Sequence, residues 1–105
     1  MSRLDQMLAF LEQDQNDSFS RYAVALEYMS VKDHRKAKEY LTELRQRDPD
    51  YVATYYQLGH VYSELEEWDA AEETYNTGIA VGKKAGDLHA VSELQQALDE
   101  LDTLR

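Results

Sequence analysis

His60 and Ser63 come nearest to a catalytic pair in this sequence. They are three residues apart, so a helix places both side chains on one face. Nucleophilic catalysis requires a nucleophile held against a base, with donors for the oxyanion. A histidine and a serine at this separation on a helix occur often by chance, and cysteine, another common nucleophile, is absent. We therefore expect that the protein is not an enzyme.

Sites for phosphates and metals are not indicated either. The glycines are dispersed and match neither a P-loop nor a dinucleotide fingerprint; they are Gly59, Gly78, Gly82 and Gly86. No histidine is four residues from another, as a zinc-binding helix requires; the three are His34, His60 and His89. We expect no cofactor and no metal.

One stretch is rich in acidic residues but lacks the ligand spacing of a calcium loop. Its members are Glu64, Glu66, Glu67, Asp69, Glu72 and Glu73. Such a run is usually a solvated turn, although it also suits a hard cation or a basic peptide.

The composition is that of one compact helical domain. Of the 105 residues, 43% are hydrophobic and 30% charged, with only four glycines and one proline. These are too few turn-forming residues for a strand-rich fold. The absence of cysteine excludes a disulfide framework and makes the cytoplasm the natural compartment. The N-terminal residues lack a signal-peptide core, and no run reaches the roughly 18 apolar residues of a membrane span.

The formal net charge of −10 excludes several classes of partner. Such a surface repels nucleic acid phosphates and anionic lipids, so we expect no nucleic acid and no membrane as partners. A strongly acidic surface is most often simply a solvated one, and it also suits a basic protein or peptide.

Apolar residues recur at helical spacing along the whole chain, which predicts an all-α fold of about six helices. Residues 1–13 carry an apolar stripe that Phe10 widens, and Asp17 or Ser18 caps the next helix, about 18–31. A third helix is stopped by Pro49. A hairpin of two helices follows within 52–83, broken by 82–86, and Asp87 caps a last helix.

The stretch Val52–Ile79 carries the pattern of a tight helical hairpin. Gly59 and Ala71 lack bulky side chains where two backbones would approach, and we expect a large residue at either position to split the hairpin. Trp68 is expected to fill the gap at the turn.

A shift of about 34 residues superimposes this pattern on the preceding segment. Val24-Ala25 then falls on Leu58-Gly59, Tyr28 on Tyr62, Ala37 on Ala71 and Leu41 on Tyr75. In this spacing the chain resembles the tetratricopeptide repeat family. It departs from the family pattern at Ala25, Arg21, Gly78 and Lys83.

The resemblance implies a right-handed α-solenoid, a stack of antiparallel helix hairpins, within a single domain of residues 1–105. Residues 1–17 form a half-repeat helix, 18–51 and 52–85 the two repeats, and 86–105 a capping helix with one polar face.

The family binds peptides in a concave groove lined by the first helix of each pair, so the resemblance implies a non-catalytic protein-binding module, an adaptor or scaffold. The candidate groove residues are Tyr22, Leu26, Met29, Ala53, Tyr56, His60 and Ser63. Phe19 shares the face of the first three. The lysine, arginine and asparagine clamp of one family subset is missing, so apolar and aromatic contacts are expected, with Glu27 or Glu64 available to a basic residue.

Several of these residues have a second interpretation. Phe19, Leu26 and Met29 suit a hydrophobic core better than a groove. Tyr22 and Tyr56 suit recognition and half-buried packing about equally. Nothing in helix packing requires a histidine at position 60, which favours a contact role there.

Self-association is the alternative function. The incomplete first repeat and the leucine-rich last helix leave two ends where apolar stripes could pair with a second copy, giving a homo-oligomer or a longer stack.

Overall fold

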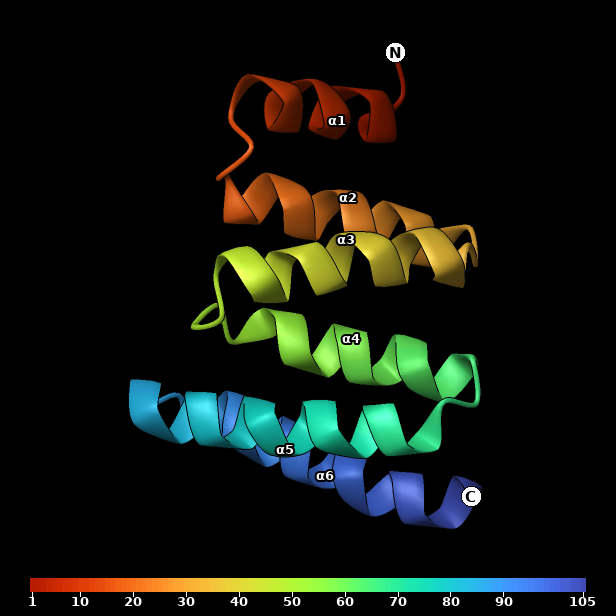
Figure 1. Cartoon of the computed structure of the whole chain (residues 1–105), viewed down its shortest axis with the longest axis vertical. Coiled ribbons are helices and arrows are strands. Elements are labelled where there is room, and N and C mark those ends of the chain that lie inside the picture. Colours follow the sequence, from red (N-terminus) through yellow and green to blue (C-terminus); the bar gives the residue numbers. More distant parts are fainter. The chain divides into compact units, whose positions relative to one another are not determined.

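The computed structural model describes all 105 residues, which form six α-helices and no strand (Figure 1). The helices are α1 (Arg3–Gln13), α2 (Ser18–Ser30), α3 (His34–Arg47), α4 (Ala53–Glu64), α5 (Trp68–Ala85) and α6 (Leu88–Leu104). The all-α prediction with about six helices is confirmed.

The helices pack into two compact units. The N-terminal unit, Met1–Tyr51, contains α1 to α3, and α2 packs against both of its neighbours. The C-terminal unit, Val52–Arg105, contains α4 to α6, and α5 packs against α4 and α6, which also contact each other. The junction coincides with the boundary between the two sequence repeats, while the assignment of all residues to one domain stays a prediction.

Side-chain caps define the starts of several helices. Asp17 and Asp87 accept hydrogen bonds from the backbone N–H groups of Ser20 and Ala90, which confirms both predicted caps. The predicted break at residues 82–86 exists, but the helix before it ends two residues later than the predicted end at about residue 83. Helix α5 continues through Gly82 and ends at Ala85, because Gly86 adopts the left-handed conformation, φ 71°, that stops a helix at its C-terminus.

The core of the N-terminal unit is built from small and branched side chains. Those most deeply buried are Val24, Ala25, Ala37, Leu41 and Leu44. Phe10 is exposed, so it does not widen a buried stripe. The core assignment of Phe19 is also wrong, since 65% of this residue is exposed. In the first turn of α2 the buried residues are instead the polar Ser20 and Arg21, which are 3% and 5% exposed.

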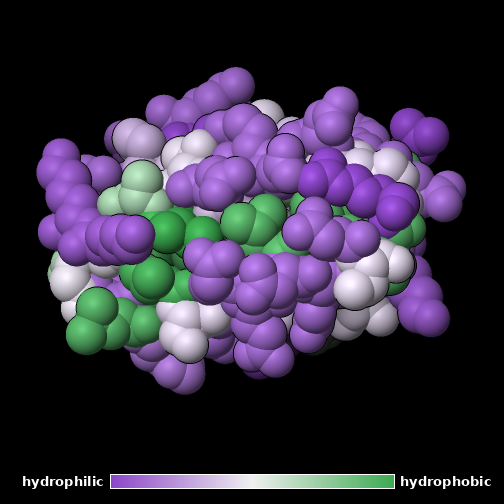
Figure 2. Space-filling model, turned by 90° about the horizontal axis from the view of Figure 1, so that it is seen from below, coloured by the Kyte–Doolittle hydropathy of each residue, from purple (hydrophilic) through white to green (hydrophobic).

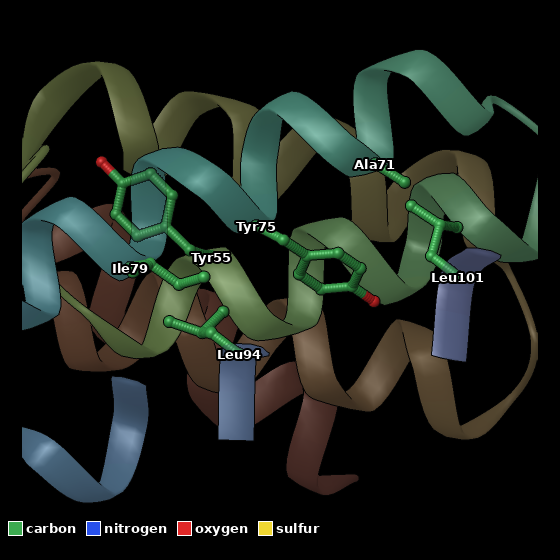
Figure 3. Close-up of a cluster of buried hydrophobic side chains, with 6 residues drawn as sticks. All are labelled: Tyr55, Ala71, Tyr75, Ile79, Leu94 and Leu101. Carbon is green, nitrogen blue, oxygen red and sulfur yellow. The ribbon is translucent and has the colours of Figure 1, made fainter. Parts of the chain in front are cut away.

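The core of the C-terminal unit is a cluster of six residues contributed by all three helices (Figure 3). They are Tyr55 from α4, Ala71, Tyr75 and Ile79 from α5, and Leu94 and Leu101 from α6. Trp68 is partly buried and packs against this cluster. The apolar stripe of the last helix is buried at Leu94 and Leu101. Helix α6 therefore covers the hairpin formed by α4 and α5.

Two glycines allow α4 and α5 to approach closely. A Cβ atom at Gly59 would lie 2.2 Å from Cε1 of Tyr75, and one at Gly78 would lie 2.4 Å from Cβ of Tyr55. The close contact predicted for Gly59 therefore exists, but its partner is the ring of Tyr75, one helical turn after Ala71. Gly78, which departs from the family pattern, is the second contact point of the hairpin.

Candidate functional site

The candidate residues of α2 lie on the N-terminal unit and are all half-buried: Tyr22, Leu26 and Met29. The ring of Tyr22 is tilted by 54° against that of Tyr51, with 5.8 Å between the ring centroids. Tyr22 thus packs against a neighbour while part of its surface stays open. The half-burial of Leu26 and Met29 fits a role in packing and a role in contact equally well.

Three of the four candidates on α4 line one hollow in the C-terminal unit: Tyr56, His60 and Ser63. Their spacing of four and three residues places them on one helical face. Ala53, at the start of α4, is exposed but does not line this hollow. The structure therefore brings together the second, third and fourth α4 candidates only.

The hollow has a volume of about 390 Å³ and receives side chains from all three helices of the unit. Its remaining lining residues are Glu64, Glu66, Trp68, Tyr75, Ala97, Glu100, Leu101 and Leu104. In Figure 3 the hydroxyl of Tyr75 points toward the end of the cluster where Leu101 lies. Tyr75 and Leu101 thus belong to the core on one side and to the hollow on the other.

The polar side chains of His60 and Ser63 approach groups one turn away on α4. The Ser63 hydroxyl donates to the carbonyl oxygen of Gly59 at 3.1 Å, and Nε2 of His60 lies 3.7 Å from Oε1 of Glu64. Burial raises the pKa of the Tyr75 phenol, and its hydrogen bond with Ser63 opposes this. The Ser63 hydroxyl thus donates to Gly59 and not to His60, and the His60 side chain is half-exposed and accessible to a ligand.

Sequence reasoning missed the walls that α5 and α6 contribute to the hollow. The sequence pattern predicts that Trp68 fills a turn and that residues 86–105 form a capping helix, whereas Trp68, Glu100 and Leu101 line the hollow. The leucine spacing of the last helix is the sequence feature that points to these walls. It brings Leu101 into the core, and the packing of α6 against α4 places other residues of α6 beside α4. The spacing alone does not predict which α6 residues line the hollow, because that depends on how α6 packs against α4 and α5.

Arg21, which stands where the family pattern has an aromatic residue, is buried in the N-terminal unit. Its guanidinium donates to the carbonyl oxygen and to the side-chain oxygen of Gln15, at 2.7 and 3.3 Å. Burial lowers the pKa of Arg21, Arg47 lowers it further, and Glu43 opposes both. Arg21 therefore ties the loop after α1 to α2, a structural role that the sequence pattern did not indicate.

The structure contains neither a metal-binding cluster nor a membrane-spanning helix. No three His, Asp or Glu side chains gather in a way that could hold a metal ion. None of the six helices combines the length and the apolar content that a membrane-spanning segment requires.

The repeat spacing, the paired helices and the close hairpin contacts agree with the comparisons with known proteins. A family model described as tetratricopeptide repeat matches residues 28–98. The chain belongs to the tetratricopeptide repeat family. The crystal structure of a tetratricopeptide repeat domain protein from Salinibacter ruber is 40% identical, with 85% of this chain and 100% of that chain covered and a TM-score of 0.80.

A second tetratricopeptide repeat structure shows the same fold at low identity. The TPR2B domain of yeast Sti1, in its complex with pHsp70, is 14% identical and has a TM-score of 0.92 over 97% of this chain and 82% of that chain. No curated protein matches the chain significantly.

Proposed function

We propose that this tetratricopeptide repeat protein is a non-catalytic interaction module that binds a peptide or a segment of a partner protein. The observation that carries the proposal is the hollow of the C-terminal unit, where Tyr56, His60 and Ser63 of α4 face Trp68 of α5 and Leu104 of α6. Its volume falls within the range of about 300–1,000 Å³ that is usual for ligand pockets.

The residue types of the hollow support this proposal. Tyrosine and tryptophan combine a large contact area with a polar group and few rotatable bonds, and they are enriched among the residues that dominate binding energy. The yeast Sti1 domain with the same fold is seen in complex with pHsp70, which supports a peptide ligand by analogy.

Two sets of further peptide contacts belong to the same proposal, one on each unit. On the N-terminal unit they are the half-buried residues Tyr22, Leu26 and Met29 of α2, and on the C-terminal unit the exposed residue Ala53 of α4. A cytoplasmic location, which the cysteine-free composition favours, is also part of it.

Selection of short peptides from a random phage-displayed library tests this function. We expect wild-type protein to enrich related peptides, and Tyr56→Ala/His60→Ala protein to bind the same peptides at least about tenfold more weakly. The control is Asn76→Ala/Lys84→Ala, which alters exposed residues of α5 that do not line the hollow. Affinities are measured by fluorescence anisotropy, with circular dichroism to verify folding. Equal affinity of both variants would contradict a site in the hollow.

Self-association through α6 is a second candidate, favoured by one specific observation. Leu88 and Leu104 at the two ends of α6 are 75% and 60% exposed. Figure 2 shows that hydrophobic side chains gather on the face that carries α6, bordered by hydrophilic ones. An apolar face of this kind suits a second copy of the chain.

Light scattering after gel filtration tests self-association. This candidate predicts that the mass rises above the 12.2 kDa of one chain as concentration increases, and that Leu88→Glu restores the monomer mass. A constant 12.2 kDa across the concentration series would exclude this candidate.

A further inference from the structure

We propose that the hollow of the C-terminal unit receives a cationic side chain, an arginine or a lysine, from the partner peptide. This inference rests on the proposed function and specifies the chemistry of the ligand at that site. It is carried by three features of the lining: an excess of carboxylates over basic groups, aromatic surfaces and an apolar wall.

The carboxylates of the hollow outnumber its basic groups. Glu64, Glu66 and Glu100 line it, whereas no lysine or arginine does, and His60 is its one basic residue. His60 lies beside Glu64. Glu66 and Glu100 form no ion pair with a basic side chain of the protein. A cationic ligand would therefore meet the carboxylates of Glu66 and Glu100, which have no basic partner in the protein.

The nearest arginine along the chain does not supply the missing charge. Arg105 follows Leu104 directly, but its guanidinium pairs with Glu72 and with Asp102, and lies 3.7 Å from Asp69. These three partners are not lining residues of the hollow. Arg105 therefore pairs with carboxylates outside the hollow and does not neutralise those that line it.

Aromatic and aliphatic residues complete the match to a basic side chain. Tyr56, Trp68 and Tyr75 line the hollow, and aromatic faces attract lysine and arginine cations through their quadrupole. The aliphatic stem of such a side chain packs on apolar surface while its charged end stays near water, and Leu101 and Leu104 offer that surface. An acidic or purely apolar side chain would satisfy only part of this lining.

The metal alternative is not supported by the geometry. The glutamates of the hollow do not form a cluster that could hold a metal ion. With a net charge of −10, the chain also attracts a basic peptide over a distance, so its association is expected to weaken as salt is added.

The test uses the phage-selected peptides, made synthetically with a fluorescein label, and matched copies in which each arginine or lysine is replaced by glutamine. The protein variant is Glu66→Gln/Glu100→Gln, which removes the two carboxylates of the hollow that have no basic partner. The control variant is Glu93→Gln, which removes a charge from α6 at a residue outside the hollow. Affinities are measured by fluorescence anisotropy at two salt concentrations.

We expect the double glutamine variant to bind the basic peptide about tenfold more weakly and the neutral copy with unchanged affinity, and Glu93→Gln to change either by less than about twofold. Selected peptides without a basic residue, or equal affinities of basic and neutral copies, would overturn the cation site. If those peptides still lost affinity in Tyr56→Ala/His60→Ala protein, the proposed function would stand. Selection of no peptide at all would overturn both proposals.

Discussion

Replacing Leu94 by alanine is expected to lower the free energy of unfolding of the C-terminal unit by about 2–5 kcal/mol. Leu94 is only 1% exposed and belongs to the six-residue core cluster. Truncation removes apolar area and leaves a cavity between α6 and the hairpin, which the surrounding helices can fill only in part. Because α6 also forms one wall of the hollow, the variant is expected to lose peptide binding as well.

Urea unfolding followed by the fluorescence of Trp68 measures this effect. The chain has one tryptophan, and it lies in the C-terminal unit, so the signal reports on the unit that contains the substitution. Leu88→Ala is the matched control, since Leu88 is on the same helix but exposed; its effect should stay within about 0.5 kcal/mol. Equal destabilisation by the two substitutions would contradict the placement of α6.

Replacing Gly78 by alanine is expected to lower the free energy of unfolding by about 1–2 kcal/mol. Helix propensity alone favours alanine over glycine by about 1 kcal/mol, and the family pattern also prefers alanine here. However, the added methyl would lie 2.4 Å from Cβ of Tyr55 and 3.1 Å from Cδ1 of Leu94. Because Cβ of Tyr55 is fixed to the backbone of α4, the two helices must move apart, and overpacking exceeds the gain in propensity.

The control for this prediction is Asn76→Ala. Asn76 lies on an exposed position of the same helix, so the change to alanine should leave stability unchanged or raise it slightly. The same fluorescence experiment compares the two variants. An increase in stability for Gly78→Ala would show that α4 and α5 are not in close contact at this residue.

The fold could be predicted from the sequence where a single helix carries the signal. The cap residues Asp17 and Asp87 act locally, and the repeat of Val24-Ala25 at Leu58-Gly59 needs only a comparison of the chain with itself. The prediction ends α5 at about residue 83 instead of Ala85, because the two glycines of 82–86 look like helix breakers. The missing side chain of Gly82 makes room instead for a methyl of Val91.

The candidate site could be predicted only where its residues share one helix. Tyr56, His60 and Ser63 follow from helical spacing. Trp68, Tyr75 and Glu100 become neighbours of these residues only through the packing of three helices, which depends on Gly59 and Gly78 admitting large rings. The core assignment of Phe19 is wrong for a different reason. The polar residues Ser20 and Arg21 are the buried ones in this turn of α2, and hydrophobicity alone does not predict that.

Nuclear magnetic resonance of isotope-labelled protein bound to a selected unlabelled peptide tests the binding site most directly. We expect intermolecular contacts from the peptide to Tyr56, Trp68 and Leu104, three residues on three different helices that meet in the hollow. Contacts confined to other surfaces, such as the exposed Leu88 end of α6, with none to these three residues, would contradict the account.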